Sequence, residues 1–192
     1  MSMTPEDAWQ EEAYDRMVND ILETHRDEII DEFVASRMAS YYDKNPDVAA
    51  AAERMLDEAV RLLEISPSAS LVFSQASVEI TLRDVLLKPI ASGMIHDEPA
   101  SPLIVGLISR NNSFMKLVLN IIEEYGFELS KITRNGSSKT RWVEMKDYKD
   151  MRQHIVHEGA EATQEQAETS LEMAEFLLRT VYPTVRMKIT GN

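Results

Sequence analysis

The sequence has no cysteine, few glycines and prolines, and no long hydrophobic run. Without cysteine the chain has no disulfide, no zinc–thiolate site and no thiol nucleophile, and we expect a reducing, intracellular setting. No stretch approaches the roughly 20 apolar residues of a membrane span, and the N-terminus is acidic where a signal peptide carries positive charge. We therefore expect a soluble, cytoplasmic protein without a membrane partner.

Glycine and proline number six and seven, and the prolines lie at the edges of periodic segments, which is typical of an all-helical protein. The predicted helices cover residues 5–42, 46–64, 67–91, 102–125, 139–157 and 163–182. We expect the first to bury a stripe that includes Phe33, Arg37 and Tyr41, and the last to stop before Pro183. The helix over 67–91 is apolar all round, so we expect it at the centre of the bundle.

Charge is distributed unevenly along the 192 residues, whose net charge is −13. Residues 1–64 carry 17 acidic and 6 basic side chains, a net of −11, whereas residues 131–152 carry 7 basic and 3 acidic ones, a net of +4. We expect an acidic N-terminal helical extension over 1–65 and a helical bundle over 66–192, within one compact unit. Broad nucleic-acid binding is disfavoured, because phosphate contacts need a wide positive surface. A charge run of this kind is ordinarily a solvated helix face, but this one ends at Arg152, which favours a local basic approach to one site.

The stretch "MRQHIVHEG", residues 151–159, places two of the four histidines together near the end of a predicted helix. A metal site is disfavoured, because a di-metal bundle site needs Glu-x-x-His motifs and residue 151 is a methionine; the His-Glu-x-x-His pattern is also absent. A plain helix end stays open, since His154 and His157 would meet the negative end of the helix dipole before Gly159. A catalytic role is the third interpretation.

Residues 152–157, "RQHIVH", match the Arg-x4-His motif of HEPN domains (higher eukaryotes and prokaryotes nucleotide-binding), an all-helical family rich in RNA-cleaving toxins and defence effectors. The segment "RQHIVHEGAEATQEQAETSLEMAEFLLRTVYP" resembles the family's usual ending, in which the motif helix closes at a glycine and a Thr-capped amphipathic helix follows. "VFSQASVEITLRDVLLKPI" is similar to the long central helix before the motif. The resemblance covers about residues 66–183. One departure is Gln153, where the family commonly has asparagine, aspartate or histidine.

The resemblance implies a HEPN-like all-α bundle and a metal-independent endoribonuclease that needs no cofactor. Arg152 and His157 would be catalytic and Gln153 orienting, because arginine offers a planar donor fork to phosphate and histidine titrates near neutral pH. Positions five apart on a helix are separated by about 140°, so Arg152 and His157 do not share a face. HEPN nucleases apply two motif helices across a two-fold axis, and the resemblance therefore implies a homodimer.

Other side chains receive supporting interpretations. His154 is a candidate supporting residue, although the simpler interpretation is a side chain in solvent or in an interface without a catalytic role. Glu79 either pairs with Arg83, four residues on, or reaches across the bundle to orient a catalytic group. Four basic residues of the positive segment are expected to guide RNA to the site: Lys139, Arg141, Lys146 and Lys149.

Two aromatic residues and two histidines have plainer interpretations. Tyr148 and Trp142 could stack on bases, but at helical spacing such residues are more often core. His25 lies on the stripe of the first helix and His96 in a loop, and we expect a structural role for both.

The biological setting suggested by the resemblance is a toxin–antitoxin or antiphage system, with RNA as substrate and an antitoxin or regulatory protein as partner. Two other interpretations stay open. One is a non-catalytic HEPN-like module that binds a nucleotide or a protein, with the acidic N-terminal helices as the interface. The other is a helical structural dimer without a ligand.

Overall fold

The computed structural model describes residues 16, 26–95, 105–106 and 114–191. No β-strand occurs in these ranges, where extended pairing is limited to one bridge between Thr133 and Thr140. The predicted all-α class is confirmed. In chain order the elements are α2 (Arg26–Lys44), α3 (Ala50–Leu62), α4 (Pro67–Ile80), η1 (Thr81–Leu87), α5 (Lys88–Met94), α7 (Phe114–Glu124), α8 (Arg141–Glu158), α9 (Gln164–Phe176), η2 (Leu177–Val181) and α10 (Tyr182–Thr190).

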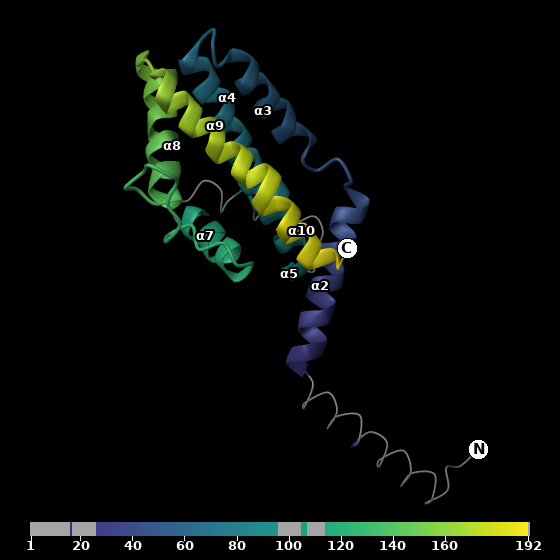
Figure 1. Cartoon of the computed structure of the whole chain (residues 1–192). Helices are drawn as coiled ribbons and strands as arrows, with labels where there is room; N and C mark the ends of the chain where they lie inside the picture. Colours follow the sequence, from purple (N-terminus) through teal and green to yellow (C-terminus); the bar gives the residue numbers. More distant parts are fainter. Residues whose placement is uncertain (1–15, 17–25, 96–104, 107–113, 192) are drawn as a thin grey trace, which may run out of the picture.

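Two long helical rods form the middle of the molecule (Figure 1). One consists of α4, η1 and α5 and the other of α9, η2 and α10, each continuous along the chain. The rods pack through α4 and α9, while α3 and α8 also contact α4. At the end away from α8, α2 packs against α5 and α10. The helix over 67–91 was predicted to be central, and α4 indeed contacts three other helices.

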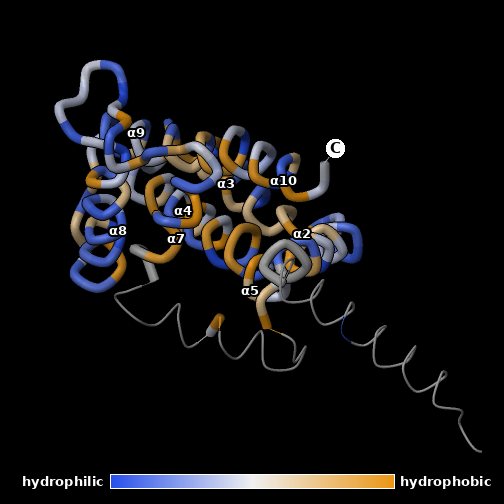
Figure 2. The backbone as a smooth tube through the Cα atoms, turned by 90° about the horizontal axis from the view of Figure 1, so that it is seen from below, coloured by the Kyte–Doolittle hydropathy of each residue, from blue (hydrophilic) through white to orange (hydrophobic). Residues whose placement is uncertain are grey.

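Apolar side chains from all of these helices fill a common core. Its composition follows the sequence periodicity, since the turns of α5 and α7 are largely apolar whereas most turns of α8 are polar (Figure 2). The helix that carries the Arg-x4-His motif is therefore a surface helix with one buried side. The largest fully buried side chains include Tyr42, Leu56, Leu71, Leu82, Leu86, Ile122, Leu129, Met145, Met173 and Leu177.

Polar side chains of α4 are buried where the central helix meets its neighbours. Ser70 and Ser77 donate hydrogen bonds to the backbone carbonyls of Ala59 and Ala52 in α3, at 2.8 and 2.9 Å. On the other side, the amide of Gln75 donates to the hydroxyl of Ser170 in α9 at 2.9 Å. Because each of these buried groups has a partner, they fix the position of α4 without a large desolvation cost.

A π-helical segment precedes a proline in both rods. The N–H of Lys88 donates to the carbonyl of Arg83, and the N–H of Tyr182 to that of Leu177, each five residues back. Proline has no N–H and clashes with the carbonyl four residues earlier. The wider π register just before it lets the helix continue.

This arrangement corrects two predicted helix ends. The last rod does not stop before Pro183, because α10 runs on to Thr190 and ends at Gly191 with φ 72°. The central rod likewise continues past residue 91 to Met94. Sequence reasoning treated Pro183 as a stop, but the π segment η2 absorbs it near the start of α10.

The buried side of α2 differs from the predicted stripe. Met38 and Tyr42 are buried, whereas Phe33 is 53% exposed. Arg37 lies on the packed side, where its guanidinium donates to the carbonyls of Ser92 and Ile95 at 2.8 Å each. This contact supplies donors to the last carbonyls of α5, which have no partner within the helix.

Part of the predicted organisation falls on residues that are not described. This holds for most of residues 5–25 in the first predicted helix and for 102–104 and 107–113 in the fourth. His25 and His96 also lie outside the described residues. The second predicted helix begins later than expected, at Ala50, after turns over 46–49.

Candidate functional site

The motif helix α8 has well-defined ends. Its N-cap is Thr140, whose hydroxyl accepts a hydrogen bond from the N–H of Val143 at 3.4 Å. Its C-cap is Gly159, which adopts φ 71°, a left-handed conformation that suits glycine. Helix α9 then begins at a capping box in which Thr163 and Gln166 exchange side-chain and backbone hydrogen bonds. The motif therefore lies on the last two turns of a helix that is fixed at both ends.

Arg152 faces the central helix rather than open solvent. Its Nη1 donates to Oε1 of Glu79 in α4 at 3.0 Å, across 73 residues of sequence. The Arg152 side chain is 35% exposed, and its Nε is buried without a hydrogen-bond partner. Glu79 was expected either to pair with Arg83 or to reach across the bundle. In the structure Glu79 pairs with Arg152 on another helix, whereas Arg83 pairs with Asp84 at 2.7 Å.

His157 lies on the exposed side of α8 with Gln153, one turn earlier. Lys146 and Lys149 continue the same face toward the N-terminus of the helix, and both are exposed. Among the described residues, neither the His157 nor the Lys149 side chain has a hydrogen bond or an ion pair. We call the set Lys146, Lys149, Gln153 and His157 the polar ridge of α8.

His154 has a local partner. Its Nδ1 lies 3.0 Å from Oε1 of Glu158, four residues on, and its side chain is 58% exposed. An exposed pair at this spacing contributes little to stability. His154 is therefore held along the helix, away from the contact between Arg152 and Glu79.

The basic residues near α8 divide into engaged and open side chains. Arg141 is only 13% exposed, pairs with Glu172 at 2.9 Å and lies over the ring of Phe176 at 4.4 Å. Its guanidinium thus joins α8 to α9, and it is not an open surface cation. Lys139 pairs with Asp147 at 2.6 Å and stays exposed.

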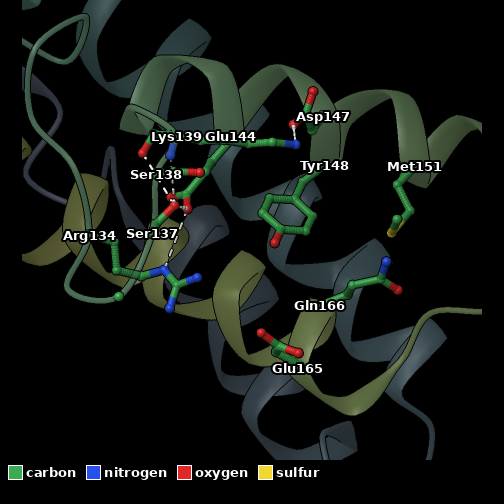
Figure 3. Close-up of a pocket in the computed structure, with 11 residues that line it drawn as sticks. Arg134, Ser137, Ser138, Lys139, Glu144, Asp147, Tyr148, Met151, Glu165 and Gln166 are labelled. Atoms are coloured by element: carbon green, nitrogen blue, oxygen red, sulfur yellow. Dashed lines mark hydrogen bonds and ion pairs between the residues drawn. The ribbon is translucent and has the colours of Figure 1, made fainter.

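The two aromatic side chains of α8 have different surroundings. Trp142 is partly buried against the core, with the ammonium of Lys146 4.8 Å from its ring centre. Tyr148 projects from α8 toward the first turn of α9 and lines a cavity of about 340 Å³ (Figure 3). Trp142 is therefore a core residue, as its helical spacing suggested, whereas Tyr148 borders a cavity.

Glu144 is a further polar residue of this cavity that sequence reasoning missed. It is only 4% exposed, and its Oε1 accepts a hydrogen bond from the hydroxyl of Ser137 at 2.7 Å. The Nε of Arg134 lies 3.6 Å from the same oxygen. Oε2 of Glu144 is buried and has no hydrogen-bond partner. No pattern in the sequence marks Glu144, because its burial depends on the fold of the 134–139 loop.

Across the described ranges, no group of three or more histidine, aspartate or glutamate side chains is arranged to hold a metal ion. No described helix is both long and apolar enough to cross a membrane. None of the protein-family models, curated proteins or solved structures compared with the chain matches it.

Proposed function

We propose that the protein is a metal-independent endoribonuclease of HEPN type that acts through Arg152 and His157. The observation that carries the proposal is the placement of these two residues on α8. Arg152 is anchored by Glu79 at 3.0 Å, and His157 stands open on the polar ridge. An anchored cation and an unengaged imidazole, one from each of two facing motif helices, suit the cleavage of a phosphodiester, and the sequence resemblance points to the same chemistry.

The reaction needs a base, an acid and a cation. A base takes the proton of the ribose 2′-hydroxyl, and the 2′-oxygen forms a bond to phosphorus. The bond from phosphorus to the 5′-oxygen then breaks, and an acid protonates the leaving oxygen, which yields a 2′,3′-cyclic phosphate and a 5′-hydroxyl. Histidine serves as base or acid near neutral pH, and arginine stabilises the charge that develops on the phosphate oxygens.

One copy of α8 supplies only part of this machinery. Arg152 and His157 lie about 140° apart around the helix axis, so a single phosphate cannot contact both at close range. A second copy of α8 facing the first would place the arginine of one protomer beside the histidine of the other. Val156, which is 54% exposed between them in sequence, offers an apolar contact for such an isologous interface. We therefore propose a homodimer in which the site is composite.

The path of RNA to this site is proposed along the polar ridge. Lys146 and Lys149 lie one to two turns before Gln153 and supply positive charge at its exposed side. Lys139 extends this charge only in part, because Asp147 neutralises it. Arg141 is left out of the path, since Glu172 and Phe176 enclose its guanidinium.

The second candidate function is a non-catalytic HEPN-like module that binds a nucleotide or a protein. The observation that favours it is the ion pair itself, because Glu79 already neutralises the charge that Arg152 would offer to phosphate. In this alternative the acidic N-terminal extension is the docking surface. In either case the biological setting that we propose is a toxin–antitoxin or antiphage system with a regulatory protein partner.

Purified protein incubated with RNA in EDTA tests the proposal. Arg152→Ala and His157→Ala are expected to abolish cutting while circular dichroism stays unchanged. Matched controls are Arg179→Ala, an exposed arginine paired with Glu175, and His154→Ala, which removes the neighbouring histidine. Intact RNA at high protein concentration would support the binding module instead. Light scattering tests the dimer, since a strictly monomeric protein cannot build the composite site.

A further inference from the structure

The loop before α8 contains a turn in which an asparagine directly precedes a glycine. Asn135 and Gly136 occupy the centre of this turn, which is closed by a hydrogen bond from the N–H of Ser137 to the carbonyl of Arg134 at 3.0 Å. Both central residues are exposed. Gly136 has φ 82°, and no described residue other than glycine has a positive φ, so the turn is of type II.

The two reactive groups of this dipeptide are not engaged in the fold. Among the described residues, neither the side-chain amide of Asn135 nor the N–H of Gly136 has a hydrogen bond. A Cβ added at Gly136 would meet no atom within 4 Å, so the space beside this residue is open. Because glycine has no side chain that blocks the approach, its backbone nitrogen can reach the side-chain amide carbon of Asn135.

We propose that Asn135 is a site of spontaneous deamidation. The backbone nitrogen of Gly136 forms a bond to the side-chain amide carbon of Asn135, and the carbon–nitrogen bond of that amide breaks. The amide nitrogen leaves as ammonia, with the proton that the backbone nitrogen has lost, and a cyclic succinimide remains. Water then opens one of the two succinimide carbonyls, which yields aspartate or isoaspartate. The reaction needs no oxidant and no cofactor, and it is independent of the proposed nuclease function.

The fold offers limited resistance to this reaction. The peptide between Asn135 and Gly136 must rotate before the nitrogen reaches the side-chain carbon. The turn bond between Ser137 and Arg134 opposes this rotation, and the hydroxyl of Ser137 is tied to Glu144 at 2.7 Å. Local opening of an exposed loop costs much less free energy than global unfolding, so the folded protein is expected to reach the reactive geometry.

Two other exposed asparagines lie in settings that oppose the same reaction. Asn45 precedes Pro46, which has no N–H, and its amide donates to the carbonyl of Tyr41 at 2.8 Å. Asn120 lies within α7, where the N–H of the next residue is a donor in the helix. Because all three asparagines are exposed, a difference in their rates reports the backbone setting rather than access to water.

Deamidation would change the loop before α8 in two ways. A carboxylate at position 135 is a fourth acidic side chain beside the seven basic ones of residues 131–152, so their net charge falls from +4 to +3. Isoaspartate also adds one carbon atom to the backbone of the turn, which would displace Ser137 from its contact with Glu144. The modification therefore acts on the loop that covers this buried carboxylate.

Peptide mapping by mass spectrometry tests the proposal on the full-length protein, folded and incubated at pH 8 in heavy-oxygen water. We expect Asn135 to convert to aspartate and isoaspartate, each with one heavy oxygen, before conversion is detected at Asn45 or Asn120. Electron-transfer fragmentation distinguishes the two products. The rate should rise from pH 7 to pH 9, because the attacking nitrogen must lose its proton. A parallel sample unfolded in guanidinium chloride gives the rate without the fold.

The matched variant is Asn135→Gln, which keeps an amide but lengthens the side chain, so this succinimide cannot form and the product should be absent. The proposal is overturned if Asn135 of the folded protein stays an amide over the time in which the unfolded protein converts. Equal conversion at Asn45 or Asn120 also overturns it, because the turn would then have no special reactivity.

The effect on the loop is tested with Asn135→Asp, which has the charge of the product and an unchanged backbone. We expect incubated protein that contains isoaspartate to have a lower Tm than Asn135→Asp. Equal Tm values would overturn the displacement of Ser137.

Discussion

The hydroxyl of Tyr42 is expected to contribute measurably to the free energy of unfolding. Tyr42 is fully buried and donates a hydrogen bond to the carbonyl of Val85 at 2.9 Å. Residue 89, which would supply the helical donor to this carbonyl, is a proline without an N–H. Tyr42→Phe removes the side-chain donor of this buried carbonyl, and we expect the free energy of unfolding to fall by about 1–3 kcal/mol.

Urea denaturation at pH 8 measures this change, with Tyr41→Phe as the matched control. Tyr41 has no side-chain hydrogen bond among the described residues, and its ring lies edge-on to Tyr42 at 6.3 Å, a contact that phenylalanine keeps. The control is expected to change stability by no more than about 0.5 kcal/mol. Equal effects of the two substitutions would refute the reasoning.

The pH dependence of the same variant gives a second check. Burial raises the pKa of Tyr42 well above its ordinary value of 10.0, with the neighbouring Tyr182 as the next cause. The folded state therefore holds the phenolic proton more tightly than the unfolded state. The resulting stability is fully present below pH 10 and is lost as the pH rises above it, by up to about 1.4 kcal/mol per unit. We expect the gap between wild type and Tyr42→Phe to narrow above pH 10, and a constant gap to pH 11.5 would contradict this origin.

Three further changes test the site and its scaffold. Glu79→Gln should reduce the rate of RNA cleavage about tenfold, because Arg152 loses the carboxylate that positions it. The free energy of unfolding should change by less than about 1 kcal/mol, because the ion pair is partly exposed. An unchanged kcat argues against a positioning role for Glu79. Thr163→Ala removes the capping box of α9 and should cost about 1 kcal/mol in thermal or urea unfolding, against no loss for the exposed Thr180→Ala. Gly159→Ala should cost about 1–2 kcal/mol from its φ of 71° alone, since the added Cβ meets no atom within 4 Å; a neutral result would show that the C-cap relaxes freely.

The local structure around the motif was predictable because its signals are local. Thr140, Gly159 and Thr163 mark helix ends through contacts with residues at most five positions away. The four-residue spacing of Gln153 and His157 also places them on one face of a helix, and in α8 both are exposed. These features depend on spacing along one helix, which a sequence displays directly.

The remaining features depend on contacts between distant segments. The pairing of Glu79 with Arg152 spans 73 residues, and the alternative with Arg83 was equally compatible with helix geometry. The enclosure of Arg141 by Glu172 and Phe176 depends on how α8 packs on α9. The sequence alone therefore does not distinguish a charged side chain that faces solvent from one that pairs with another helix.

The π segments explain why Pro183 wrongly predicted a helix end. A proline in a helical pattern usually predicts an end, and Pro183 was assigned that role. The shift to five-residue hydrogen bonds over Leu177–Val181 depends on packing of the rod as a whole. Burial of Glu144 is a similar case, because the 134–139 loop that covers it has no periodic signal.

The most direct test of the central claim is the analysis of RNA ends after incubation with the wild-type protein in EDTA. The account predicts fragments with a 2′,3′-cyclic phosphate and a 5′-hydroxyl, absent from parallel reactions with Arg152→Ala or His157→Ala and present with Arg179→Ala. Fragments with other ends, or equal cutting by His157→Ala, would contradict the assignment of Arg152 and His157 as the catalytic pair.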